Sequence, residues 1–248
     1  MTAFPPKKLR DFFIHFDKNN PKHIEAVDRL QSDGTARLWN DNATWVKIYR
    51  TPVEEPAKPE SPAWPITKAQ MGQIMLCSEE SLPDSLMDDY ARCVSDCEMD
   101  TLEQVYFLGQ VGHESAGLRY PMEIHDGSNY EGRCSDLGNC KPGDGVKYAG
   151  TGFIQVTGAY WHKEFTEFIG DPKVYEIGKT YTAEKYPWSI SAFWWLRNNM
   201  KQLCAAHPAC TNSDIDTIGA RVNGRNRPNG ADDRIAYTDR AYKTLIGI

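Results

Sequence analysis

The chain has 248 residues, of which 40% are hydrophobic, and its formal net charge is −6. This length holds one large domain or a domain with a small appendage, and the apolar fraction is ordinary for a soluble globular protein. No run of about eighteen apolar residues is present, so we expect no membrane insertion. Residues 53–100 carry eleven acidic against three basic side chains, which argues against nucleic acid as a partner.

A proline-rich segment predicts the first boundary in the chain. Residues 51–65 read TPVEEPAKPESPAWP, a composition that cannot bury a core and favours an extended linker. Residues 1–50 contain a short amphipathic stretch and several aromatic side chains, which suits either a small binding module or a helical appendage. No apolar run with a cleavage site follows Met1, so we expect no signal peptide. Residues 66–248 form the predicted main domain.

Helical periodicity dominates the main domain. Thr67 and Gln70 form a capping box before one helix, and Asp100 and Glu103 form another before a helix that ends near Glu114. In that helix Gly109 and Gly112 predict close packing of another backbone. Further helices are expected over 83–97, 159–169, 187–200, 214–222 and 232–245, with glycines at 170 and 224 as stops.

Residues 117–158 are rich in glycine and show little helical periodicity. We predict an irregular loop or a short hairpin, and a loop of this length inside a compact domain usually has a function. Two cysteine pairs, Cys134 with Cys140 and Cys204 with Cys210, are close enough in sequence to bridge short loops. The alternative is that all seven cysteines are reduced. No CxxC pair is present, and the six histidines form no recognisable ligand set, so we expect neither a metal nor another cofactor.

Two candidate catalytic carboxylates belong to this region: Glu114 just before the glycine-rich stretch and Glu131 within it. Glu114 follows an apolar helix face, and partial burial would favour the protonated form that a general acid needs. Glu131 lies in the loop, with Glu123 as a rival for the same role. Hydrolysis of a glycosidic bond needs one carboxylic acid to protonate the leaving oxygen and a second carboxylate to activate water or attack the sugar. The pair therefore indicates a glycosidase.

Five sequence blocks extend this reading. They are His113-Glu114-Ser115, Tyr130-Glu131-Gly132-Arg133, Leu137-Gly138-Asn139, Pro142-Gly143-Asp144-Gly145 and Gly152-Phe153-Ile154-Gln155-Val156-Thr157-Gly158. In this order they resemble the catalytic core of glycoside hydrolase family 19, the chitinase-like branch of the lysozyme superfamily, and within it the bacterial and bacteriophage wall-degrading enzymes. The resemblance covers roughly residues 65–248 and implies a mainly α-helical, lysozyme-like fold with a long glycine-rich active-site loop.

The resemblance also implies roles for single residues. Glu114 corresponds to the general acid and Glu131 to the base that activates water in an inverting mechanism. Gln155 and Thr157 correspond to positions that bind the N-acetyl group and hold the water, and Asn223 to a substrate-binding asparagine. Arg234 matches an arginine that follows; it either tunes the acid and base or forms a salt bridge with Asp232 or Asp233. Tyr130, Tyr148 and Trp161 either stack on sugar faces or belong to the core.

Three positions depart from the family pattern. Thr151 replaces an arginine, Trp161 replaces an asparagine that normally positions water and sugar, and Arg225 replaces the second glycine of N-G-G. These changes predict weaker activity or a shifted substrate.

The sequence as a whole predicts a monomeric, lysozyme-type endolysin that cleaves β-1,4 bonds in bacterial peptidoglycan. It would be made in the host cytoplasm and act on the wall in the periplasm or outside the cell. Chitin hydrolysis is the alternative, because both polymers contain N-acetylglucosamine. An inactive wall-binding or virion structural protein is the alternative of a different class, and the presence of both Glu114 and Glu131 argues against it.

Overall fold

The structure is a computed structural model that describes residues 65–225 and 227–247, which belong to one compact unit. The predicted appendage 1–50 and all but the last residue of the predicted linker lie outside the described residues. The helices, in chain order, are α3 (Lys68–Met75), η3 (Glu79–Ser81), α4 (Asp84–Asp96), α5 (Thr101–Glu114), η4 (Ser128–Tyr130), α6 (Cys134–Leu137), α7 (Asp144–Lys147), α8 (Ala159–Ile169), α9 (Lys173–Ile177), α10 (Lys179–Lys185), α11 (Pro187–Arg197), α12 (Met200–Ala205), α13 (Asn212–Asn223) and α14 (Ala231–Leu245). No strand occurs among these residues, so the predicted mainly helical fold is confirmed.

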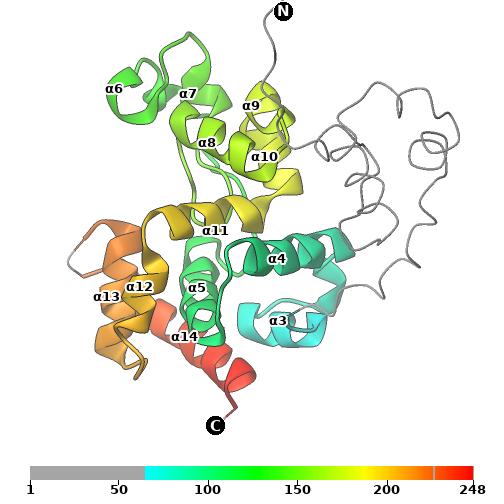
Figure 1. Cartoon of the computed structure of the whole chain (residues 1–248), viewed down its shortest axis with the longest axis vertical. Coiled ribbons are helices and arrows are strands. Elements are labelled where there is room, and N and C mark those ends of the chain that lie inside the picture. The colour runs from blue at the N-terminus through cyan, green and yellow to red at the C-terminus, as the bar shows by residue number, and fades with distance from the viewer. Residues whose placement is uncertain (1–64, 226, 248) are drawn as a thin grey trace, which may run out of the picture. The chain divides into compact units, whose positions relative to one another are not determined.

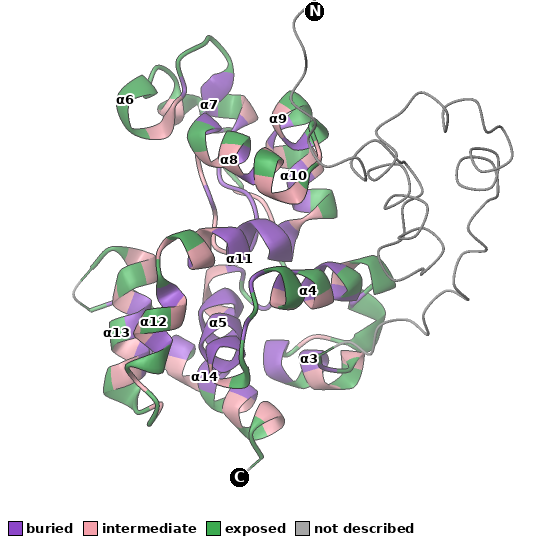
Figure 2. Cartoon of the chain, viewed as in Figure 1, coloured by how far each residue is buried: buried purple, intermediate pink, exposed green. Residues whose placement is uncertain are grey.

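Helix α5 is the centre of the fold. Ten consecutive residues, Glu103–Gly112, are buried, and Figure 2 shows this helix enclosed by its neighbours. Helix α14 packs along it at the two predicted glycines. A Cβ on Gly109 would lie 2.0 Å from Thr238 Oγ1, and one on Gly112 would lie 2.3 Å from Tyr237 Cδ1. The prediction of close backbone packing is therefore confirmed.

Helix α11 lies between two groups of helices. Figure 1 shows α6 to α10 on one side of it and α3, α5 and α12 to α14 on the other. Its residues contribute to two hydrophobic clusters: Trp188 and Trp195 pack in the larger one with α5, and Ile190 and Phe193 pack in the smaller one with α8 and α9. Trp194 is half-buried and contacts both. This helix joins the two sides of the domain.

A buried aspartate fixes the start of α11. Asp89 of α4 is 2% exposed; one of its oxygens accepts hydrogen bonds from the backbone N–H groups of Trp188 and Ser189, and the other accepts one from the Ser189 hydroxyl. Burial raises the pKa of Asp89 from 3.8 to about 6, although these hydrogen bonds act in the opposite direction. An unpaired helix N-terminus is thus satisfied by a side chain 99 residues away in sequence.

The glycine-rich stretch is an irregular loop that contains short helices. Two isolated bridges join Thr151 to Met122 and to Val156, in place of the alternative hairpin. A disulfide joins Cys134 to Cys140, whereas Cys204 and Cys210 are free thiols, so only the first of the two candidate bridges forms.

The helix predictions hold in most places and fail where helices are short. Thr67 and Gln70 make the reciprocal capping box, and Asp100 caps α5 through the Glu103 N–H, without the return bond of a full box. The helix predicted over 187–200 ends at Arg197, because Asn199 adopts a left-handed conformation (φ 56°) before α12 begins.

Among the described residues, none of the helices has the length and apolarity needed to cross a bilayer.

Candidate active site around Glu114 and Arg234

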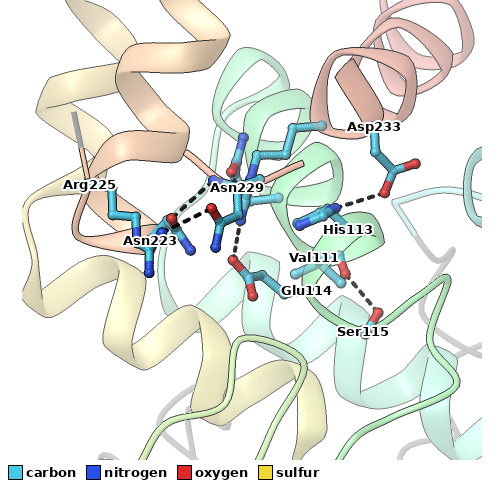
Figure 3. Close-up of polar contacts among 10 residues, drawn as sticks. Val111, His113, Glu114, Ser115, Asn223, Arg225, Asn229 and Asp233 are labelled. Atoms are coloured by element: carbon cyan, nitrogen blue, oxygen red, sulfur yellow. Dashed lines mark hydrogen bonds and ion pairs between the residues drawn. The ribbon is translucent and has the colours of Figure 1, made fainter. Parts of the chain in front are cut away.

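Glu114 is the last residue of α5. The buried helix ends there, so the side chain is carried out of the core and is 22% exposed. Its Oε1 accepts a hydrogen bond from Arg234 Nη2 at 2.5 Å (Figure 3). No described residue donates a hydrogen bond to Oε2. One oxygen of the carboxyl group is therefore held by the protein, and the other is left for a ligand or a proton.

Arg234 is a buried cation, and each of its three guanidinium nitrogens donates a hydrogen bond. The side chain is 1% exposed. Its Nη1 donates to Gln110 Oε1 at 2.6 Å, and its Nε donates to the backbone oxygen of Asn229 at 3.0 Å. A buried guanidinium needs an acidic partner, and the carboxyl group of Glu114 is the one that it contacts. Of the two predicted roles, the contact with the acid is the one observed. The alternative pairing with Asp232 or Asp233 is not.

Asp233 pairs with His113 instead. His113 Nδ1 and Asp233 Oδ2 are 2.7 Å apart, which ties the end of α5 to the start of α14 beside Glu114. The His113 ring lies over Gly230, where a Cβ would come within 1.9 Å of the ring Cε1. Gly230 also has a left-handed backbone (φ 67°), so a glycine is required here for both reasons.

Asn223 joins this arrangement at the end of α13. Its Oδ1 accepts a hydrogen bond from the Asn229 N–H at 3.1 Å, and Arg225 Nη1 donates to Asn229 Oδ1 at 3.3 Å. Because Asn229 also accepts from Arg234, the predicted residues Glu114, Arg234 and Asn223 belong to one connected network (Figure 3).

Glu131 follows the short helix η4 and is exposed. Its two oxygens accept from the N–H groups of Gly143, at 3.1 Å, and Val146, at 3.4 Å, around the start of α7. No hydrogen bond or ion pair joins Glu131 to Glu114 within the described chain. The glycine-rich loop thus holds Glu131 by backbone donors, independently of the Arg234 network.

The rival Glu123 is more constrained. Its Oε1 accepts a hydrogen bond from the Tyr130 hydroxyl at 3.1 Å, and its Oε2 accepts one from the Gly150 N–H at 3.0 Å. Partial burial, and then the neighbouring Glu123, raise the pKa of Tyr130. Both glutamates accept hydrogen bonds at both oxygens, but Glu123 is half-buried and Glu131 is exposed, so Glu131 is more accessible to water and is the better candidate base.

Gln155 and Thr157 lie on the turn that closes the loop. Gln155 has a positive φ of 58°, and its Nε2 donates to the backbone oxygens of Tyr120 and Gly152, both at 3.2 Å. Its Oε1 is buried without a hydrogen-bond partner. Thr157 Oγ1 donates to the Gln155 backbone oxygen at 3.0 Å. The strained backbone and the unsatisfied oxygen are features that functional sites concentrate.

Of the three predicted sugar-stacking residues, Tyr148 is buried, whereas Tyr130 and Trp161 are half-buried. Tyr148 is 1% exposed, stacks on Tyr175 and donates its hydroxyl to the Tyr175 backbone oxygen, so its ring is a core element and the predicted contact with sugar does not fit. Trp161 is half-buried against Phe193 and has the exposed Tyr160 at its edge. Trp161 and Tyr130 therefore keep a surface for a ligand, and the Tyr130 hydroxyl group is bonded to Glu123.

Some contacts of the hydrogen-bond network around Glu114 and Arg234 were not predicted. They are made by Gln110, by Asn229 and by the His113–Asp233 pair. Gln110 stands one turn before Glu114, a spacing that places the two side chains on one face of a helix. That spacing is the signal in the sequence from which the role of Gln110 could have been predicted. The described part of the chain contains no group of three or more His, Cys, Asp or Glu side chains placed to hold a metal ion.

Comparison with known proteins supports the fold. No family model matches the chain. The crystal structure of chitinase C from Streptomyces griseus HUT6037 is similar with a TM-score of 0.52 and 19% sequence identity, over 74% of this chain and 94% of that chain. A chitinase C mutant is similar with a TM-score of 0.54 and 15% identity, over 75% of this chain and 95% of that chain. The predicted chitinase-like fold is confirmed. At these identities the likeness concerns the fold alone.

Proposed function

We propose that this protein is a glycoside hydrolase of the lysozyme type, which cleaves β-1,4 bonds in the glycan of bacterial peptidoglycan by inverting acid/base catalysis. The observation that carries the proposal is the carboxyl group of Glu114, presented at the end of a buried helix and held through one oxygen by the buried Arg234. The chitinase-like fold supports it, since this arrangement sits in the same kind of helical scaffold.

Glu114 is the proposed general acid. It must carry a proton to the leaving oxygen of the glycosidic bond. Arg234, which is itself held by Gln110, donates to Oε1, so Oε2 is the oxygen available to hold that proton. Partial burial strengthens the effect of each charge on the reacting group.

Glu131 is the proposed general base. It is exposed, and the two backbone N–H groups that donate to it orient the carboxylate. An inverting mechanism needs the two carboxyl groups to be roughly 6.5 to 9.5 Å apart so that a water molecule fits between base and sugar. Gln155, Thr157, Asn223 and Trp161 are the proposed contacts of the sugar and the water.

Chitin hydrolysis is the second candidate. Both solved structures compared above are chitinases, and chitin shares N-acetylglucosamine with peptidoglycan. Under this alternative the same two glutamates would act on a neutral polymer.

The test is to incubate the protein with purified peptidoglycan and, separately, with chitin oligosaccharides. Mass spectrometry of the fragments identifies the cleaved bond: reducing-end muramic acid means a muramidase, and reducing-end glucosamine a glucosaminidase. Release of free peptides alone would mean a different enzyme and would contradict the proposal. Proton NMR of the first products is expected to show inverted anomeric configuration. A retained anomer would mean a nucleophilic carboxylate instead of a base.

A further inference from the structure

Three arginines lie together where α13 ends beside the Glu114–Arg234 pair. Arg221 is in the last turn of α13, Arg225 and Arg227 follow in the loop to α14, and all three are exposed. Residues 217–230 contain no Asp or Glu. In the part of the chain that the structure describes, none of the three forms an ion pair. Asp216 precedes this segment and Asp232 and Asp233 follow it, so residues 217–230 form a short basic segment within a chain of net charge −6.

The loop that carries these charges is anchored. Pro228 is buried against α13, where a Cβ on Gly219 would lie 2.9 Å from Pro228 Cγ. The next residue, Asn229, donates its N–H to Asn223 and accepts a hydrogen bond from Arg234. Pro228 and Asn229, which follow Arg227, are therefore held by contacts with α13 and with the network that holds Glu114.

Arg225 is connected to this network by its side chain. Its Nη1 donates to Asn229 Oδ1 at 3.3 Å, and Figure 3 shows Arg225, Asn229 and Glu114 in one neighbourhood. A guanidinium group has five N–H donors, and this contact uses one of them. The remaining donors of Arg225 are available to a ligand that occupies the site.

We infer that Arg225 and Arg227 bind carboxylate groups of the glycan substrate, so that the site prefers an anionic muramyl glycan over neutral chitin. The inference rests on the proposed function, because it assigns the substrate class of the same site. Guanidinium groups bind carboxylates through paired, charge-assisted hydrogen bonds, and they gain nothing comparable from neutral N-acetylglucosamine. Muramic acid carries a free lactyl carboxylate where no stem peptide is attached. Where a stem peptide is attached, the lactyl group is an amide and the carboxylates belong to the peptide. Arg225 stands where the resembled family has a glycine.

Binding to the full-length Glu114→Gln variant tests the inference without turnover. Isothermal titration would compare three soluble tetrasaccharides: a chitotetraose, a peptide-free muramyl glycan with free lactyl carboxylates, and the same glycan with stem peptides. Each is measured with Arg225 and Arg227 intact, with both changed to Gln, and with both changed to Lys. Arg197→Gln, which removes one exposed charge from α11, is the matched control.

We expect the double Gln variant to bind carboxylate-bearing glycans roughly two- to tenfold more weakly, as exposed ion pairs allow, and to bind chitotetraose unchanged. The double Lys variant should retain only part of the affinity, because an ammonium group keeps the charge without the paired hydrogen bonds, and high salt should reduce the difference between variants. A loss with only the peptide-bearing glycan would assign the contact to the peptide carboxylates, and a loss with only the peptide-free glycan to the lactyl carboxylate. A loss with both would mean that the arginines accept either carboxylate.

Two results would overturn the inference while leaving the proposed function intact: equal losses for neutral and anionic glycans, or no loss for any of them. Failure of the Glu114→Gln protein to bind any of the three would overturn the inference and the proposed function together.

Discussion

The side chain of Arg234 donates three hydrogen bonds in the interior, and each goes to a different part of the chain. Its acceptors are the backbone of Asn229, the amide of Gln110 and the carboxyl group of Glu114. Glu114 and Arg234 could be predicted because they lie in recognisable motifs. Gln110 could not, because a glutamine in a buried helix shows its role only when α14 brings Arg234 against it.

Replacing Gln110 with Leu is expected to lower activity at least tenfold and to destabilise the protein by about 1–3 kcal/mol, because a buried guanidinium N–H loses its acceptor. The matched control is Gln104→Leu. Gln104 is another buried glutamine of α5, bonded to Tyr90 and to the backbone of Met99, away from Glu114. Urea unfolding and initial rates on soluble glycan should show both variants destabilised and only Gln110→Leu impaired in catalysis. Equal rates for the two variants would contradict the role of Gln110.

At the scale of elements, local signals predicted the long helices and missed the short ones. Thr67, Asp100 and the glycines at 170 and 224 mark helix ends through contacts within a few residues, so the sequence reveals them. Helices α6, α7, α9 and α10 have seven residues or fewer, too short to be stable alone, and they depend on packing that is not local. The contact of Asp89 with the start of α11 could not be predicted either, because the two partners are 99 residues apart in sequence.

The contact between α5 and α14 predicts that Gly109→Ala destabilises the protein. The new Cβ would meet Thr238 Oγ1 at 2.0 Å, a clash that costs roughly 1–3 kcal/mol and exceeds the gain of about 1 kcal/mol in helix propensity. Thermal unfolding should show a lower Tm. Adding Thr238→Ala should recover part of the loss because it removes the clashing hydroxyl. A Gly109→Ala protein as stable as the parent would show that the helices are not in close contact.

The contact between α4 and α11 predicts a pH-dependent contribution from Asp89. Its pKa is raised from 3.8 to about 6, so the folded protein holds a proton that the unfolded chain releases. The contribution to stability is therefore complete below pH 3.8 and is lost as the pH rises through about 6. Asp89→Asn cannot titrate. Its free energy of unfolding should rise relative to the parent across this range by up to roughly 3 kcal/mol.

Urea unfolding at several pH values between 4 and 7 measures this difference, with the exposed Asp96→Asn on the same helix as the control. A gap between parent and Asp89→Asn that stays constant with pH would mean that Asp89 titrates alike in the folded and unfolded states.

At the scale of the whole molecule, the two hydrophobic clusters and every candidate site residue lie between Ile66 and the C-terminal helix. We therefore expect a truncated chain that begins at Ser61 to fold and to cleave soluble glycan fragments at the rate of the full chain. Its activity on intact walls should fall if residues 1–50 bind the envelope, because tethering raises the local concentration of enzyme. A truncated chain that is insoluble, or inactive on soluble fragments, would place the front segment within the catalytic fold.

The central claim is that Glu114 donates the proton that breaks the glycosidic bond, and the rate of the Glu114→Gln variant on soluble peptidoglycan fragments tests it most directly. The amide keeps the shape of the side chain and can still accept the hydrogen bond from Arg234, so the variant should fold, with a lower Tm because the buried guanidinium loses its acidic partner. Without an acidic proton, the rate should fall by a factor of roughly 10² to 10⁴. Retention of more than about a tenth of the parent rate by a folded variant would contradict general acid catalysis by Glu114.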